Sequence, residues 1–209
     1  MPNPAAPATL WPPGGPAAMS DEGAGGRSLA TDRLVLRPFS AGDIDALAPI
    51  YGDPRVMEIR RIGVQTRQGT VEQLEEMVRH WRAYGFGLWA LIRRSDRRLI
   101  GECGLHHVGQ ASGDVQLAYG LASDCWGAGY ASEASVAALD HGFFEVGLAR
   151  VVARAKASNE RSHAVLRRLG MRLERTWTGP DGRDRVEFAI DRDAWCARDR
   201  AVQTEEKVS

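Results

Sequence analysis

Seven short segments of the chain have the alternation or the composition of apolar and polar residues that is typical of β-strands. The first, Arg-Leu-Val-Leu-Arg at residues 33–37, changes between polar and apolar at every position. Gly-Pro-Asp-Gly at 179–182 joins the last two segments in the manner of a hairpin turn. The strands are expected over residues 33–37, 86–92, 99–107, 115–121, 150–155, 171–178 and 185–190.

Four segments are predicted to be helices. Ser40 followed by Asp43, and Thr70 followed by Gln73, have the spacing of residues that cap a helix at its start. Apolar residues then recur at helical spacing as far as position 81. Gly170 stands where a glycine ends a helix. The helices are expected over residues 41–52, 70–81, 129–145 and 159–169.

The order of these elements, β-α-α-β-β-β-α-β-α-β-β, combines hairpins with one βαβ crossover. It predicts an α+β fold with a mixed sheet and argues against a doubly wound one. One domain is expected over residues 29–197. Residues 1–28, rich in Pro, Ala and Gly, are predicted to be a disordered leader, in which Met1 or Met19 is the start. Residues 198–209 are predicted to be a polar tail.

Composition excludes several classes of protein. Lys and Arg total 27 and Asp and Glu total 27 in 209 residues, so the net charge is zero. Such a chain has no overall attraction to nucleic acid or to an anionic membrane, and neither partner is expected. No run approaches the 18 apolar residues of a membrane-spanning helix. The three cysteines are too scattered to predict a metal site, and they indicate a reducing, cytoplasmic location.

Arginine supplies 25 of the 27 basic residues, and only Lys156 and Lys207 are lysine. We attribute this bias mainly to codon usage, and the sequence alone gives the two lysines no function.

A loop with two glycines, CWGAGYA at 125–131, lies between the predicted strand 115–121 and the predicted helix 129–145. Glycines let backbone N–H groups approach a ligand, and a helix start adds unpaired N–H groups and a positive dipole end. Together they predict an anion site suited to a pyrophosphate. Ser132 occupies the third glycine position of a dinucleotide fingerprint, and the Gly-Lys-Ser/Thr of a P-loop is absent. Taken alone, the loop is a weak signal, and a simple tight turn is the better interpretation.

The wider sequence WGAGYASEA at 126–134 resembles the acyl-CoA signature Q/R-x-x-G-x-G/A of the GNAT superfamily, in the W-G-x-G-Y-A-x-E-A form of its RimJ/RimL-like branch. A second segment is similar to that branch's N-x-x-S…L-x-x-L-G-F pattern. It consists of Asn159, Ser162 and Leu166, followed by Leu-Gly-Met at 169–171, with Met171 in place of Phe. Residues 31–38, 85–90 and 99–105 resemble its first three strands. The resemblance covers residues 31–195.

This resemblance implies an N-acetyltransferase with a three-layer α/β/α domain. Its central sheet would be mixed, mostly antiparallel, and splayed between the fourth and fifth strands, 115–121 and 150–155. Acetyl-CoA would lie in the gap as co-substrate, and a protein N-terminal or small-molecule amine would attack its thioester directly, through a tetrahedral intermediate. The enzyme would be a monomer or a homodimer and use no metal. The alternatives are a non-catalytic acyl-CoA-binding module, or an acyltransferase for another donor such as succinyl-CoA.

The resemblance also assigns roles to residues. Ser162 would face the departing thiolate, and Asn159 would cap its helix and contact the pantetheine arm. The residues expected to bind acetyl-CoA are Leu117, Tyr119, Gly120, Leu121, Trp126, Gly127, Ala128, Gly129, Tyr130, Ala131, Asn159 and Ser162. Arg60 and Arg61 border the acceptor groove of relatives, and we expect them to be solvated, with binding of an acidic substrate as the alternative.

The general base is the open question of this site. Gln116 stands where many relatives carry Glu, and an amide can orient an acceptor or a water but cannot take a proton. Glu102, His106 and His107, on the preceding strand, are the nearby candidates. An α-amine, with a pKa of about 8, is partly neutral at pH 7, whereas a lysine amine, near 10.4, is almost wholly charged. An acceptor of low pKa would therefore need no dedicated base.

Overall fold

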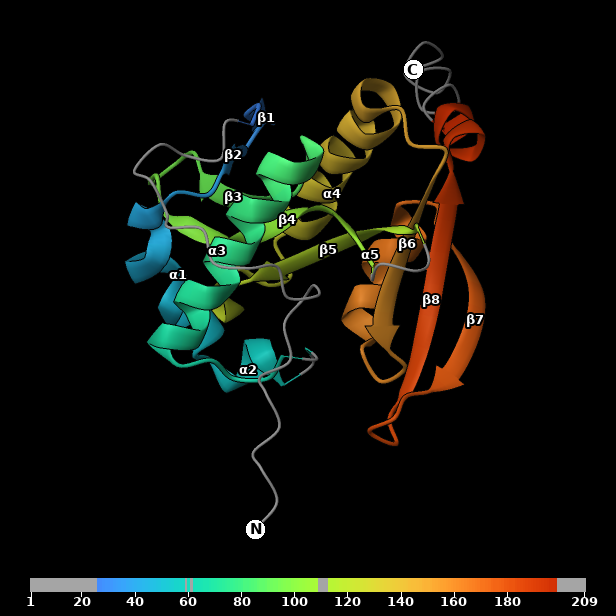
Figure 1. The fold of residues 1–209 in the computed structure, drawn as a ribbon. Coiled ribbons are helices and arrows are strands. Elements are labelled where there is room, and N and C mark those ends of the chain that lie inside the picture. The colour runs from blue at the N-terminus through green and yellow to red at the C-terminus, as the bar shows by residue number, and fades with distance from the viewer. Residues whose placement is uncertain (1–25, 59, 61, 109–112, 199–209) are drawn as a thin grey trace.

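The computed structural model describes residues 26–58, 60, 62–108 and 113–198 (Figure 1). The predicted leader and tail lie almost entirely outside these residues, and their boundaries stay predictions. So does the choice between Met1 and Met19.

Eight strands form one sheet in the order β1-β2-β3-β4-β5-β6-β8-β7. Every neighbouring pair is antiparallel except β5 and β6, which are parallel. This arrangement confirms the α+β class and the mixed, mostly antiparallel sheet. The first strand has only two residues, too few for any alternation to predict it. The strands are β1 (Leu29–Ala30), β2 (Leu34–Pro38), β3 (Leu88–Arg93), β4 (Leu99–His107), β5 (Val115–Leu121), β6 (Arg150–Lys156), β7 (Arg172–Thr178) and β8 (Asp184–Asp191).

Helices cover both faces of the sheet, with α1 and α3 on one side and α4 and α5 on the other (Figure 1). Neighbouring side chains of β4 alternate between these layers: Cys103 Sγ lies 3.6 Å from Ser135 Oγ on α4, whereas Glu102 is directed to Arg60 in the opposite layer. The helices are α1 (Ile44–Tyr51), α2 (Pro54–Met57), α3 (Arg67–Tyr84), α4 (Tyr130–Asp140) and α5 (Glu160–Arg168), with 3₁₀ turns at Ala41–Asp43 and Ser123–Cys125 and a π-helical turn at His141–Val146.

Two helix starts differ in how well the sequence predicted them. The backbone N–H of Ser40 donates to Asp43 Oδ2 at 2.8 Å, which confirms the first capping pair. The second prediction was wrong, because α3 begins one turn before Thr70. Thr66 caps it by accepting from the N–H of Gly69 at 3.1 Å, and the buried Thr70 hydroxyl donates to the Thr66 carbonyl. The first turn of α3 carries no apolar residue that would have marked it.

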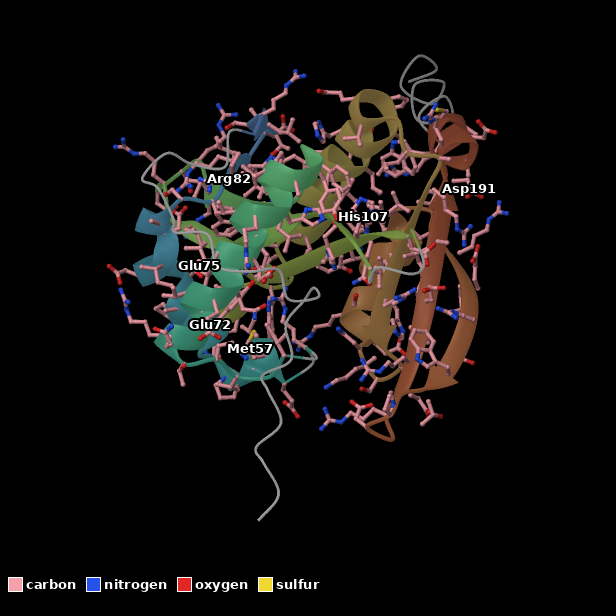
Figure 2. The ribbon with its side chains drawn as sticks, in the orientation of Figure 1. Met57, Glu72, Glu75, Arg82, His107 and Asp191 are labelled. Carbon is pink, nitrogen blue, oxygen red and sulfur yellow. The ribbon has the colours of Figure 1, made fainter. Side chains whose placement is uncertain are left out.

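The exposed face of α3 is polar along its length, with Glu72, Glu75 and Arg82 spread over the helix in Figure 2. Its other face is buried in the core through four apolar residues, Leu74, Met77, Val78 and Trp81. This division fits the helical spacing seen in the sequence. The predicted helix over 129–145 is also present, although its last turn widens into the π-helical segment before Gly147.

Strands β5 and β6 separate almost as soon as they meet. Seven residue pairs join β4 to β5, and seven join β6 to β8. Among the described residues only one pair, Gln116 with Val152, joins β5 to β6. The sheet is therefore splayed between the two predicted strands, and the opening lies at their C-terminal ends (Figure 1).

Candidate active site

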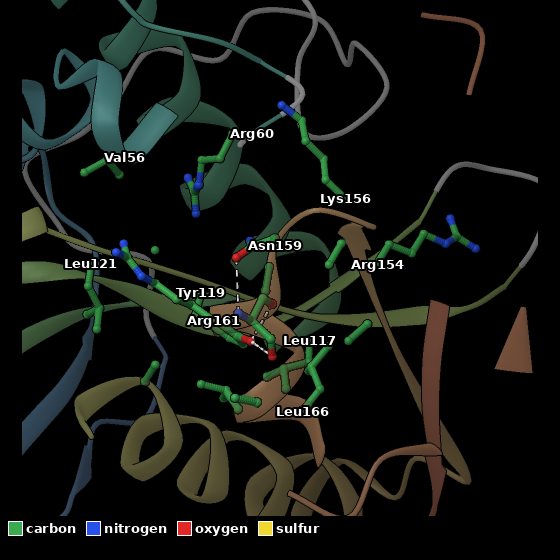
Figure 3. A pocket seen from close by; sticks show the side chains of 18 of the residues that line it. Val56, Arg60, Leu117, Tyr119, Leu121, Arg154, Lys156, Asn159, Arg161 and Leu166 are labelled. Carbon is green, nitrogen blue, oxygen red and sulfur yellow. Dashed lines mark hydrogen bonds between the residues drawn. The ribbon is translucent and has the colours of Figure 1, made fainter. Parts of the chain in front are cut away.

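The divergence of β5 from β6 opens a cavity of about 1010 Å³ (Figure 3). Strands β5 and β6, the glycine loop and the start of α5 form its walls. The β7–β8 hairpin completes the rim together with four residues of α2 and the loop after it, Arg55, Val56, Glu58 and Arg60. The structure thus brings together segments that are far apart in the sequence.

Side chains of β5 point alternately to the two sides of this cavity. Tyr119 is directed toward α5, where its hydroxyl meets Ser162. Gly120 faces the opposite layer, where a Cβ would collide with the side chains of Arg60 and Glu102. The cavity therefore has an α5 side and an opposite side, separated by the backbone of β5.

The glycine loop has the conformation that exposes its backbone. Gly127 and Gly129 have φ angles of 76° and 83°, in the left-handed region that favours glycine. The first intrahelical bond of α4 runs from the N–H of Glu133 to the Gly129 carbonyl, so the N–H groups of residues 130–132 have no partner within the helix. The N–H of Trp126, expected to face the ligand, instead points to the Ser123 carbonyl at 3.4 Å.

Glu133 fixes this loop against the beginning of β2. Its carboxylate accepts from the Thr31 hydroxyl at 2.6 Å, and from the backbone and Nε of Arg33 at 2.9 and 2.7 Å. Burial opposes ionisation, but these hydrogen bonds outweigh it and hold the pKa of Glu133 below its usual value. Arg33 also donates to the Ala128 carbonyl at 2.8 Å and lies over the Tyr130 ring. Ala128 is the one predicted loop residue that does not line the cavity.

Two hydroxyl groups meet at the α5 side of the cavity, one from the start of α5 and one from β5. Asn159 caps the helix, as expected, by accepting from the Ser162 N–H at 3.2 Å. The hydroxyls of Ser162 and Tyr119 lie 2.8 Å apart (Figure 3). Burial raises the pKa of Tyr119, so its phenol stays protonated at neutral pH. Sequence reasoning included Tyr119 only as a ligand contact; its position two residues from Leu117 and Leu121 on one strand face was the available signal.

Glu102 lies on the other side, away from the cavity surface. Its side chain is 0% exposed and forms an ion pair with Arg60, whose side chain is 12% exposed and lines the cavity. Burial raises the pKa of Glu102, and the Arg60 guanidinium opposes that shift. The expectation that Arg60 is solvated was wrong, because this buried carboxylate and the Tyr51 ring hold it against the sheet. Arg61 lies outside the described residues.

Of the remaining candidates for a base, two line the cavity and one lies in a ring cluster outside it. Gln116 and His106 are register partners on β5 and β4, and both line the cavity. Burial lowers the pKa of His106 to about 3, so its imidazole is neutral at pH 7. His107 instead stacks in a cluster with His80, Tyr84 and Phe86, and it is absent from the described lining of the cavity.

The fold and its splayed sheet define an acetyltransferase of the GNAT type. Residues 33–172 match the family described as acetyltransferase (GNAT) domain. The chain therefore belongs to the GNAT family of N-acetyltransferases, within its RimJ/RimL-like branch, and enzymes of this family use acyl-CoA. The resemblance that the motifs indicated is confirmed at the level of the family.

Two curated relatives cover most of the chain. One, p20 of Bacillus licheniformis, described as an uncharacterized N-acetyltransferase, is 29% identical over 148 residues, which are 70% of this chain and 83% of the relative. The other, the uncharacterized protein YkkB of Bacillus subtilis (strain 168), is 31% identical over 157 residues, which are 73% of this chain and 91% of the relative.

Solved structures share the fold. An acetyltransferase from Agrobacterium tumefaciens has a TM-score of 0.69 and 27% identity, covering 78% of this chain and 94% of its own. RimL, a ribosomal L7/L12 alpha-N-protein acetyltransferase solved in complex with coenzyme A, has a TM-score of 0.71 and 18% identity, covering 80% of this chain and 99% of its own.

Two further searches concern other kinds of site. Over the described ranges, the helices are all too short or too polar to cross a membrane. Within the same part of the chain, His, Cys, Asp and Glu side chains nowhere gather in a group of three or more that would hold a metal ion.

Proposed function

We propose that this enzyme transfers an acetyl group from acetyl-CoA to a primary amine by direct attack of the amine on the thioester. The observation that carries the proposal is the early separation of β5 and β6 after the Gln116–Val152 pair. Beyond that pair, main-chain groups of β5 that point toward β6 have no strand partner, and a buried edge of this kind needs one. The amides of a pantetheine arm, extended along residues 117–121, would supply it.

The far end of the cavity suits the phosphates of the same ligand. The free N–H groups at the start of α4 and the positive end of its dipole favour an anion there. Two arginines strengthen the site: Arg161 lies 4.8 Å from the ring centre of Trp126, and Arg168 donates to Ser132 Oγ at 3.1 Å. Both line the cavity. A chain of zero net charge thus places cations beside the glycine loop, and a volume of about 1010 Å³ is sufficient for a ligand of this length.

Chemistry would take place near the point where the strands part. The amine nitrogen bonds to the thioester carbon, the carbon–sulfur bond breaks, and the proton that the nitrogen loses balances the one that the departing thiolate takes up. The Tyr119 and Ser162 hydroxyls, 2.8 Å apart on the α5 side, are the donors placed to stabilise it. Gln116, on the opposite face of β5, would orient the incoming amine. Glu102 would act indirectly, by holding Arg60 in place.

Glu58, the one carboxylate residue in the described lining, lies at the rim of the cavity, Gln116 cannot take a proton, and Glu102 is buried behind Arg60, so we infer that the amine must arrive neutral. An α-amine with a pKa of about 8 satisfies this condition at neutral pH far better than a lysine near 10.4. The acceptor class that follows is a peptide N-terminus or a small amine of low pKa.

This function is tested by measuring the release of thiol from acetyl-CoA with a panel of amines. Mass spectrometry then identifies the products. We expect turnover with α-amines and little with lysine side chains. Binding of CoA without turnover of any amine would contradict the proposal and favour a non-catalytic acyl-CoA-binding module. Faster turnover with succinyl-CoA than with acetyl-CoA would show that the proposed acyl donor is wrong.

A further inference from the structure

Basic side chains surround the cavity on the side opposite α5. We call this the basic mouth, and it consists of Arg55, Arg60, Arg154, Lys156 and Arg185, with Glu58 as its acidic member. Most of these charges are already compensated by carboxylates outside the cavity. Arg55 pairs with Asp53, Arg154 with Glu187 and Asp114, and Arg185 with Asp181. Arg60 pairs with the buried Glu102, and Lys156 remains without a carboxylate partner among the described residues.

Lys156 ends β6 and extends across the mouth toward the segment that follows α2 (Figure 3). Its ammonium donates to the backbone carbonyl of Glu58, and within the described part of the chain no carboxylate lies at ion-pair distance from it. Burial first, and then the charges of Arg183 and Arg185, lower its pKa, whereas the carboxylates of Glu58 and Asp181 oppose the shift. Lys156 is also the one lysine in the described residues of a chain that otherwise uses arginine.

Arg60 forms the inner wall of the mouth. Its Nη2 is held by Glu102, and its Nη1 is buried beside Tyr51 and Glu102. A Cβ at Gly120 would meet Nη2 and Cζ of this guanidinium, and the loop that carries Arg60 is the one Lys156 contacts. Arg60 is therefore a fixed part of the wall, and the ammonium of Lys156 is the donor at the rim.

We propose that the basic mouth is a carboxylate subsite for the acceptor, with the Lys156 ammonium as its donor. The acceptor is then an amine that carries a carboxylate close by, such as a peptide N-terminus followed by an acidic residue. A carboxylate there gives Lys156 a counter-charge at ion-pair distance. This inference rests on the proposed acetyl transfer, because it names the acceptor of the same site.

The test compares acceptors that differ by one charge. Two C-terminally amidated peptides, identical except for Asp or Asn after the N-terminal Ala, keep the α-amine nearly constant. A third peptide, neutral in its side chains but with a free C-terminal carboxylate, distinguishes the source of the anion. We expect the wild type to prefer the Asp peptide in kcat/KM by roughly tenfold, mainly through KM, as one partly exposed charged hydrogen bond allows.

Variants of Lys156 then assign the preference to this residue. Lys156→Gln keeps a donor for the Glu58 carbonyl but removes the charge, and it should reduce the Asp-to-Asn ratio to near one. Lys156→Arg should retain most of the ratio. Arg172→Gln, at an exposed position of β7 outside the cavity lining, removes one positive charge elsewhere and should leave the ratio unchanged. Equal kcat/KM for the two peptides in the wild type, or an undiminished ratio in Lys156→Gln, overturns the subsite.

A binding measurement separates this inference from the proposed function. Reductive ¹³C-methylation labels the two lysines and the N-terminal amine, so the Lys156 resonance is assigned by its loss in Lys156→Arg. The Asp peptide should shift this resonance and the Asn peptide should not, whether or not turnover occurs. Absence of turnover with every amine contradicts the proposed transfer, whereas an unmoved Lys156 resonance contradicts the carboxylate subsite.

Discussion

Replacement of Gly129 by aspartate tests the phosphate site at the point where the ligand is expected to lie closest to the backbone. Gly129 has φ 83° and ψ 0°, and a Cβ built there would meet only Arg33 Nη2, at 3.4 Å. The structure therefore has space for a side chain at this position, but the positive φ is unfavourable for a residue that carries one. Asn and Asp enter the left-handed region more readily than other residues, so Gly129→Asn and Gly129→Asp share a shape and differ in charge.

The difference between the two variants measures the charge term alone. Two unit charges 4 Å apart interact by about 1 kcal/mol in water and about 4 kcal/mol at an effective dielectric constant of 20. Since about 1.4 kcal/mol corresponds to a tenfold change in affinity, Gly129→Asp should bind CoA between about fivefold and several hundredfold more weakly than Gly129→Asn. Because the loop is partly open to water, we expect a value near the lower half of that interval.

Isothermal titration calorimetry with CoA provides the assay, and thermal unfolding of both free variants provides the control for folding. Added salt should narrow the gap between the variants, because it screens a charge that is accessible to solvent. Equal CoA affinity for Gly129→Asp and Gly129→Asn, with both folded, would show that no phosphate lies beside this residue and would refute the assignment of the loop.

Other parts of the account are open to equally direct tests. Ser162→Ala and Tyr119→Phe should each lower kcat more than they weaken CoA binding, because we propose that both hydroxyls stabilise the leaving thiolate; a matching loss of affinity in calorimetry would argue against that role. Glu133→Gln should lower the free energy of unfolding at pH 7 by about 1–2 kcal/mol through its lost charged hydrogen bonds. The folded pKa of Glu133 is depressed, so this contribution to stability is present above the unfolded pKa, near 4.3, and is lost as pH falls through the folded value. In urea unfolding, the difference in unfolding free energy between the wild type and Glu133→Gln should therefore disappear below about pH 4. Thr66→Ala should cost about 1 kcal/mol in the same assay, and a negligible effect would mean that α3 does not begin there.

Local signals were sufficient for most of the fold. Strands β4 and β5 begin and end where alternation and composition placed them, because each is fixed by apolar residues directed into one core. Short elements were not predicted. The four-residue α2 is held by Asp53, which accepts from the Arg55 N–H at 2.9 Å, and a single turn is too short to generate a periodic pattern.

The site was harder to predict where its contacts join distant segments. The glycine loop and the Asn159 cap depend on neighbours within a few residues, and sequence reasoning located both. Arg60 and Glu102 are 42 positions apart, and only the packing of the loop after α2 onto β4 turns an expected surface arginine into a buried ion pair. The meeting of Tyr119 with Ser162 likewise depends on how α5 packs across β5, which no local pattern encodes.

Lys156 illustrates a third limit. Its rarity in an arginine-rich chain was visible in the sequence, but rarity alone does not indicate a role. The contact with the Glu58 carbonyl, and the position on the cavity rim, give that observation a physical meaning.

The central claim is that acetyl-CoA binds through backbone amides along β5 and at the start of α4. Amide hydrogen exchange, measured with and without saturating acetyl-CoA, tests it most directly. The account predicts slower exchange over residues 117–121 and 127–132, with little change in the outer strands β1 and β7. Binding that leaves these two segments exchanging at their free rates would contradict the account.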